Sequence, residues 1–64
     1  MNKFYKKLKH LRRKNRLTIE QFAKLVGVNK STIINWEKGL TSPRIDYLIV
    51  ICRVLKTSVN DLLK

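Results

Sequence analysis

Apolar residues recur along this chain at helical spacing, and short polar or glycine-containing turns separate the helical stretches. In residues 3–15, Phe4, Leu8 and Leu11 fall at positions i, i+4 and i+7, which places them on one face of a helix. The rest of that stretch is mostly cationic. No stretch shows the strict alternation that is expected of a β-strand. The pattern therefore predicts an all-α fold that begins with a basic, amphipathic helix.

The next two predicted helices are short and closely joined. They span about 19–26 and 30–38. A capping box that begins at Thr18 marks the start of the first of them, and Gly27 lies where it can end in a left-handed conformation. Asn29 is a suitable N-cap for the second. The connection of two or three residues predicts a steep crossing, which is typical of a helix-turn-helix.

A fourth helix is expected over 45–55, and a short fifth helix after a second capping-box pattern at 58–61. The apolar positions of the fourth helix are Ile45, Leu48, Ile49, Cys52 and Leu55. The pattern as a whole predicts a compact five-helix bundle that forms a single domain over 1–64.

The helix over 30–38 is predicted to carry different residues on its two sides. At about 100° per residue, Ile33 and Trp36 fall on the side that faces the core. The outward side carries Lys30, Ser31, Ile34, Asn35 and Lys38. An exposed polar helix of this kind fits the major groove of DNA, which is about 12 Å wide.

The outward side chains have the chemistry that base edges require. Lys30 can donate to guanine O6 and N7, Asn35 can pair with adenine N6 and N7, and Ser31 can contact either base. Ile34 has two interpretations, either contact with a thymine methyl group or sugar, or a single exposed aliphatic side chain. We therefore predict base contacts from the three polar residues, with Ile34 as the fourth candidate.

The charge of the chain indicates a polyanionic partner. Fifteen Lys and Arg residues oppose four acids, which gives a net charge of +11. Eight of the fifteen cations lie in residues 1–16, where there is no acid. A field of one sign attracts nucleic acid, an acidic membrane surface or an acidic protein. These cations are expected to act as a group and to raise the field over the DNA-facing region.

The remaining chemistry argues against catalysis. Cys52 is the single cysteine and lies in the apolar run LIVICRVL, so we expect a core residue. One Cys and one His cannot form a zinc site, and no nucleophile–base pair or phosphate loop is evident. No apolar run is long enough to span a membrane, and no signal-peptide pattern follows the basic start. We expect a cytoplasmic, nucleoid-associated protein with no metal, cofactor, small-molecule ligand or membrane partner.

Two segments resemble the Cro/repressor-type (Xre-like) helix-turn-helix family, namely LTIEQFAKLVGVNKSTIINWEKG and VLKTSVNDLL, together with Pro43 between them. The resemblance runs from Phe4 to Leu63. It implies a lambda-repressor-like fold in which the helix-turn-helix is formed by helices 2 and 3 and the third helix lies in the major groove. It also implies a transcriptional repressor or activator that binds double-stranded DNA as a dimer, and we predict a repressor.

Further roles are implied only by this resemblance. It places phosphate contacts near Thr18, Lys38 and Arg44. It also pairs Arg12 on the first helix with Glu37 at the inner edge of the third helix, as a structural ion pair.

The chain departs from the family pattern at two informative positions. Ile19 stands where a polar, phosphate-contacting side chain is common, so only its backbone N–H at the start of helix 2 can serve. Lys56 stands where glycine is usual before the last helix, so we expect mild strain in that loop.

The resemblance also places a dimer contact around helices 4 and 5. Tyr47, Val50 and Val59 are apolar there and not obviously needed in the core. We predict a weak homodimer on a pseudo-palindromic operator, with half-sites about 34–36 Å apart. A monomer that pairs only on DNA is the alternative.

Two other functions compete with this one. The first helix alone would suit a cationic amphipathic protein that acts on membranes, although that role does not explain the caps, Gly27 or Trp36. A helix-turn-helix scaffold that binds another protein would usually expose aromatic anchors, whereas the outward side of 30–38 is polar.

Overall fold

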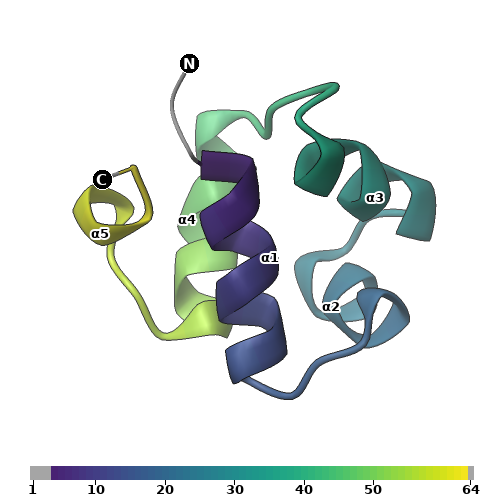
Figure 1. Cartoon of the computed structure of the whole chain (residues 1–64), viewed down its shortest axis with the longest axis horizontal. Helices are drawn as coiled ribbons and strands as arrows, with labels where there is room; N and C mark the ends of the chain where they lie inside the picture. The colour runs from purple at the N-terminus through teal and green to yellow at the C-terminus, as the bar shows by residue number, and fades with distance from the viewer. Residues whose placement is uncertain (1–3, 64) are drawn as a thin grey trace.

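The computed structural model describes residues 4–63, and these form five helices without a strand. The helices are α1 (Phe4–Lys14), α2 (Ile19–Val26), α3 (Lys30–Lys38), α4 (Ile45–Leu55) and α5 (Val59–Leu63). In Figure 1, α1 stands in front of α4, with α2 and α3 on one side and α5 on the other. The all-α prediction is confirmed, and α2, α3 and α4 have the predicted bounds. Helix α1 ends one residue earlier than predicted, and residue 3 lies outside the described residues.

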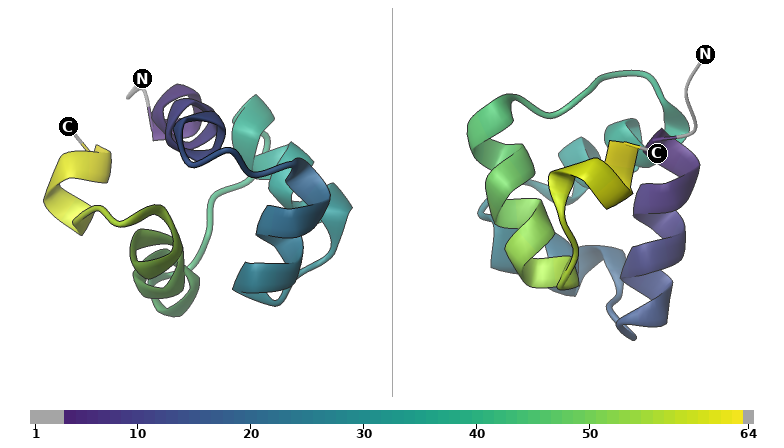
Figure 2. Two further views of the ribbon diagram at one scale, coloured as in Figure 1. Left: turned by 90° about the horizontal axis from the view of Figure 1, so that it is seen from below. Right: turned by 90° about the vertical axis from the view of Figure 1, so that its left-hand side faces the viewer.

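Every helix contributes to one core. The fully buried large side chains are Leu8, Phe22, Ile33, Ile51 and Leu62, one from each helix. Burying a side chain of this size stabilises the fold by about 1.5–3 kcal/mol. The short helix α5 lies across α1 and α4 and closes the core on that side (Figure 2). No helix can therefore be removed without exposing apolar surface.

The start of α2 is fixed by hydrogen bonds from its first residues. The Thr18 hydroxyl oxygen accepts the Gln21 N–H at 3.0 Å, and the Gln21 side-chain oxygen accepts the Thr18 N–H at 2.9 Å. This reciprocal pair is the predicted capping box. Before α5, the Ser58 hydroxyl accepts the Asp61 N–H at 3.0 Å, but within residues 4–63 the Asp61 carboxylate does not return a bond to the Ser58 N–H, so only half of the predicted second capping box is present. Asn29 occupies the N-cap position of α3, but its side chain makes no capping hydrogen bond.

The connection between α2 and α3 is a tight turn. Gly27 has a φ of +90°, a left-handed conformation that costs little only for glycine. The N–H groups of Gly27 and Val28 both donate to the Ala23 carbonyl, at 2.8 and 3.0 Å. Val28 also packs against the core. The turn brings α3 against α2 directly after only three residues, so the predicted helix-turn-helix is present.

Two residues other than glycine also adopt left-handed backbone conformations. Lys56, which follows α4, has a φ of 56°, as expected where a lysine stands in place of a glycine. Arg16, between α1 and α2, has a φ of 59°, which the sequence pattern did not indicate. Each such residue costs roughly 1–2 kcal/mol relative to a right-handed conformation.

Only some of the apolar positions of α4 lie in the core. Its buried residues are Leu48, Ile51, Cys52 and Leu55, whereas Ile45 and Ile49 are 67% and 47% exposed. Helix α4 turns the face centred on Leu48 and Ile51 toward the other helices. The apolar positions in a helix that is hydrophobic on several faces do not identify the buried face.

Candidate nucleic-acid interface

Helix α3 is held in place by two buried side chains on its inner side. Ile33 is fully buried and Trp36 nearly so. The Trp36 ring lies 6.0 Å from the Tyr47 ring on α4, measured between centroids, at a tilt of 52°. A tilted arrangement at this distance is favourable for aromatic pairs. The inner side of α3 therefore anchors the helix to both the core and α4.

The opposite side of α3 faces away from the core. Lys30, Ser31 and Lys38 are exposed, while Ile34 and Asn35 are half-buried. Within residues 4–63, the side chains of Lys30, Ser31 and Asn35 form no hydrogen bond or ion pair. These three polar groups are consequently available for a ligand.

Arg12 and Glu37 form a buried ion pair that joins α1 to α3. Arg12 Nε donates to one Glu37 carboxylate oxygen at 2.6 Å, and a terminal guanidinium nitrogen donates to the other at 3.1 Å. The second terminal nitrogen donates to the Leu17 carbonyl at 2.7 Å. The side chains are only 8% and 6% exposed. The guanidinium thus fixes α3 relative to both α1 and the segment that leads into α2.

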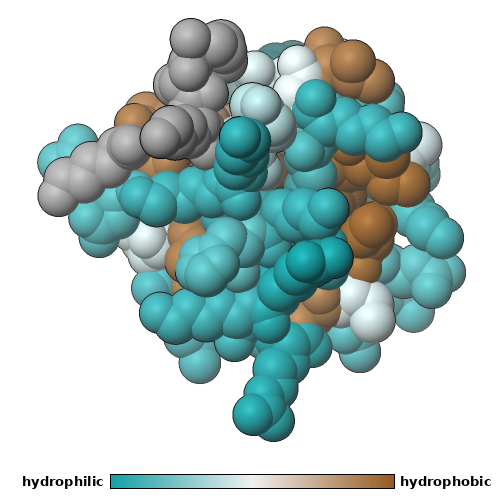
Figure 3. Space-filling model, viewed as in Figure 1, coloured by the Kyte–Doolittle hydropathy of each residue, from teal (hydrophilic) through white to brown (hydrophobic). Residues whose placement is uncertain are grey.

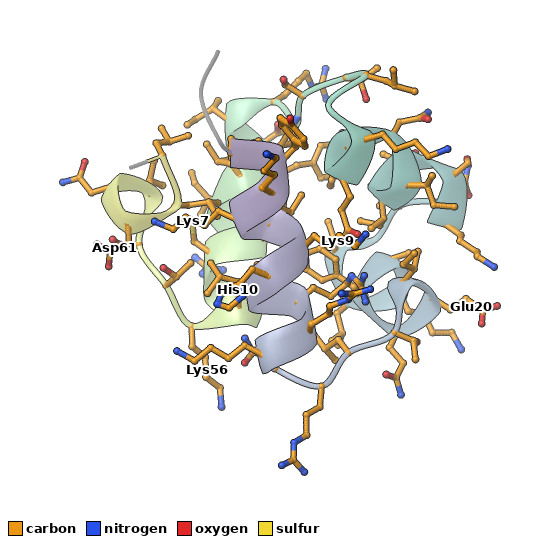
Figure 4. All side chains as sticks on the ribbon, viewed as in Figure 1. Lys7, Lys9, His10, Glu20, Lys56 and Asp61 are labelled. Carbon is orange, nitrogen blue, oxygen red and sulfur yellow. The ribbon has the colours of Figure 1, made fainter. Side chains whose placement is uncertain are left out.

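A shallow groove lies where the start of α2 meets α1 and α3. Its lining residues are Arg12, Arg13, Thr18, Ile19, Glu20 and Lys30. The capping box uses the Gln21 N–H, and the first N–H groups of a helix have no partner within the helix. Those groups, together with the positive end of the helix dipole and the nearby cations, favour an anion. Figure 4 shows the Glu20 side chain pointing away from α1, at the far edge of α2.

The residues predicted to contact phosphates are all on the surface. Thr18 is exposed and its hydroxyl already caps α2, and Lys38 is exposed at the end of α3. Arg44 lies at the N-cap position of α4, 3.6 Å from the Asp46 carboxylate and 5.9 Å from the centre of the Tyr47 ring. Exposed pairs of this kind contribute only about 0–1 kcal/mol, so Arg44 can exchange Asp46 for another anion.

The cations of α1 lie on more than one side of the helix. Arg13 lies in the groove at the start of α2, and Lys9 points from α1 toward α3 (Figure 4). In contrast, Lys7 donates to the Asp61 carbonyl on α5, and His10 lies on that same side. Successive helical positions lie about 100° apart, so a dense run of cations necessarily surrounds the helix. Sequence reasoning included Arg13 only as one of a group of cations, and the structure places it at the groove beside the start of α2.

The remaining chemistry of the described chain offers no reactive centre. Cys52 is buried, and burial raises the pKa of its thiol, so the thiol is protonated at neutral pH. Residues 4–63 contain no cluster of His, Cys, Asp or Glu that could hold a metal ion. In the same residues, no helix has the length and apolar character that crossing a membrane requires.

Comparison with protein families identifies the class of protein that this fold and surface define. The model of the helix-turn-helix family HTH_3 matches residues 8–62, which include α2, α3 and α4 and most of α1 and α5. The chain therefore belongs to this helix-turn-helix family, as the resemblance had indicated.

Individual relatives agree with this assignment. The chain is 32% identical over 60 residues to YobD of Bacillus subtilis, described as an uncharacterized HTH-type transcriptional regulator; this covers 94% of the chain and 54% of YobD. A crystal structure of SinR, the master regulator for biofilm formation, in complex with DNA superposes with a TM-score of 0.87 and 31% identity, covering 95% of the chain and 98% of the SinR chain in that structure. The N-terminal DNA-binding domain of SinR from Bacillus subtilis superposes with a TM-score of 0.89 and 28% identity, covering 100% of the chain and 94% of that domain's chain. The chain spans about half the length of YobD.

Proposed function

We propose that this protein binds specific sequences in double-stranded DNA and regulates transcription, as a repressor that occupies its operator. The observation that carries the proposal is the outward face of α3, where Lys30, Ser31 and Asn35 are without partners on a helix anchored by Ile33 and Trp36. The similar structure of SinR in complex with DNA supports the proposal.

The proposed base contacts follow from the side chains on this face. Lys30 donates to guanine O6 and N7, and the Asn35 amide pairs with adenine N6 and N7. Ser31 donates to or accepts from either base, and Ile34 contacts a thymine methyl group. Because α3 is fixed by the core and by the ion pair of Arg12, its backbone loses little conformational entropy when the helix enters the groove.

The proposed phosphate contacts surround the base-contacting face. The first N–H groups of α2 donate to one phosphate, which lies in the groove beside them with Thr18 and Arg13 at its edge. Lys38 and Arg44 contact the backbone near the other end of α3. Such contacts set the position of the protein on the duplex, whereas the contacts from α3 set the sequence.

Alanine substitution on the outward face should change sequence preference. Lys30→Ala and Asn35→Ala are each expected to relax the preference at one base position by about 1–3 kcal/mol. Neither side chain has a partner within residues 4–63, so both variants should fold. Selection of bound sequences from random DNA measures the effect. Arg53→Ala, an exposed change on α4, is the control, and unchanged preference in both α3 variants would argue against base contact.

We also propose a weak homodimer that contacts a pseudo-palindromic operator. Tyr47, Val50 and Val59 are partly buried against the core, so only their outer atoms are available. The exposed Ile45 and Ile49 lie four positions apart on one face of α4 and add apolar area to this surface. A contact between two copies of α4 and α5 would place two α3 helices on successive turns of one face of DNA.

Sedimentation equilibrium at several concentrations tests the dimer. The average mass is expected to rise from the monomer value of 7.6 kDa as concentration increases. Ile49→Glu should suppress this rise, because it places a charge in the apolar contact, and Lys24→Glu on α2 is the matched exposed control. A protein that stays monomeric at high concentration and binds a single half-site with full affinity would exclude the dimer.

The proposed mechanism is occupation of a DNA site, without catalysis, cofactor, metal ion or small-molecule ligand. Because the proposed ligand is chromosomal DNA, we place the protein at the nucleoid in the cytoplasm. The apolar stripe of α1 that a membrane-active protein would insert is packed inside the fold, with Phe4 and Leu8 buried. The membrane interpretation therefore has less support than duplex DNA.

A further inference from the structure

A second cationic surface lies on the side of α1 that faces α5. Lys7, His10 and Lys14 are spaced at i, i+3 and i+7 along α1, so they share one side of the helix. Figure 4 shows Lys7 and His10 on the side of α1 near α5, with Lys56 close to the lower end of α1. Helix α3 lies on the opposite side of α1 (Figure 1). This surface is therefore separate from the proposed DNA-contacting face.

The surface contains a groove between α1 and the turn that connects α4 to α5. Its lining residues are Leu11, Lys14, Asn15, Leu55, Lys56 and Thr57. The Asn15 amide donates to the carbonyls of Leu11 and Leu55, at 2.8 and 3.3 Å, and so joins the two walls. Lys14 and Lys56 are exposed, one on each wall. Two lysines at one groove can supply two ammonium groups to phosphates.

Lys56 supplies a cation to this groove from a backbone position where glycine would be less strained. Its φ of 56° is one that glycine adopts without strain. A glycine there would relieve the strain but remove the charge. The position is consistent with a role for the ammonium group itself.

We propose that this second surface binds the phosphate backbone of a second DNA duplex, so that one protein molecule joins two duplexes. The inference rests on the proposed function, because α3 holds the first duplex. Lys7 and Lys14 are about 10 Å apart along the helix axis, a span that covers about three base steps of one strand. Since lysines contact phosphates as point charges, binding at this surface is independent of sequence.

The character of the surface favours a duplex over a membrane or an acidic protein. Figure 3 shows hydrophilic side chains covering most of the face over α1. Attachment to a membrane would require exposed apolar side chains here, but Phe4 and Leu8 point into the core. Asp61 lies at the edge, where its carbonyl accepts Lys7 Nζ at 3.0 Å, and it lowers the local charge by one. The surface remains cationic without an apolar anchor, which is typical of phosphate binding.

The experiment compares three proteins of known charge. These are the wild type, the double variant Lys14→Gln/Lys56→Gln, and the control Lys24→Gln/Arg53→Gln, which removes two exposed cations from α2 and α4. Fluorescence anisotropy measures binding to one labelled duplex. Energy transfer between donor-labelled and acceptor-labelled duplexes, at low salt and limiting protein, measures joining. We expect energy transfer with the wild type and the control, and a reduction of about tenfold with Lys14→Gln/Lys56→Gln.

The two measurements separate this inference from the proposed function. If none of the three proteins binds the single duplex, both the proposed function and this inference fail. If the wild type binds it without joining a second duplex, only this inference fails. Joining by a dimer through two α3 faces would survive Lys14→Gln/Lys56→Gln and overturn the proposal. Binding to phosphatidylserine vesicles that is lost in this variant, with no joining of duplexes, would assign the surface to a membrane instead.

Discussion

Replacing Glu37 with alanine is expected to lower the free energy of unfolding by about 3–5 kcal/mol. The substitution leaves the Arg12 guanidinium buried beside α3 without its carboxylate, because the pair is only 8% and 6% exposed. The Leu17 carbonyl remains as an acceptor for one nitrogen, but the two hydrogen bonds to Glu37 are lost. Removing one partner of a buried pair costs more than the pair contributes, since the remaining charge is desolvated and uncompensated.

This loss is large relative to the stability of so small a domain. A chain of 64 residues has a free energy of unfolding of about 3–10 kcal/mol at typical values per residue. Glu37→Ala should therefore unfold at a much lower urea concentration than the wild type. Urea denaturation followed by circular dichroism measures the effect, with the exposed Glu20→Ala as control.

A double variant separates the lost charge from the lost packing. Arg12→Met combined with Glu37→Leu replaces both charged groups by apolar side chains, and it should be more stable than Glu37→Ala alone. If Glu37→Ala unfolded at the same urea concentration as Glu20→Ala, the ion pair would have no structural role.

The affinity for DNA is expected to fall steeply with salt. If each protomer neutralises about five to eight phosphates, log K should decrease with log salt with a slope of about −4.5 to −7. A rise from 50 to 200 mM salt then weakens binding by about 500-fold to 20,000-fold. The contacts invoked are the first turn of α2 with Arg13, and Lys38 and Arg44 near the end of α3, within a chain of net charge +11.

Single substitutions measure how much each contact contributes to the salt dependence of the affinity for DNA. Lys38→Gln should make the slope shallower by about 0.9, the value for one phosphate, with little change in sequence preference. Asn35→Ala should instead change the preference and leave the slope as it is, because the amide carries no charge. An affinity that does not vary between 50 and 200 mM salt would rule out the phosphate contacts altogether.

The local elements were predictable because their signals are short-range. Thr18 and Gln21 form their capping box within four residues, and Gly27 ends α2 by a conformation that glycine adopts freely. The helical spacing of Ile33 and Trp36, three positions apart, likewise identified the buried side of α3. In each case the deciding interaction lies within one or two helical turns.

Which apolar residues of α4 and α5 are buried depends on which helices pack together. Ile45 and Ile49 have the spacing of core residues, yet they are exposed because α2 and α5 cover the other face of α4. Tyr47, Val50 and Val59 looked dispensable for the core, yet they pack against it. A helix that is apolar on several sides can pack into the core through any of these sides. Only the positions of the neighbouring helices determine which side is buried.

The amino-acid pattern alone established five helices, the helix-turn-helix between α2 and α3, and the polar outward face of α3, since caps, glycines and helical periodicity act locally. The packing of α1 against α3 on one side and α5 on the other decided how its cations are divided. It places Arg13 at the groove beside the start of α2, whereas Lys7 contacts α5 and Lys14 lines a groove together with Lys56. Cations on one helix can belong to two surfaces, because successive residues of a helix point in different directions. Contacts between residues that are distant in sequence determine which of those directions face each neighbouring helix.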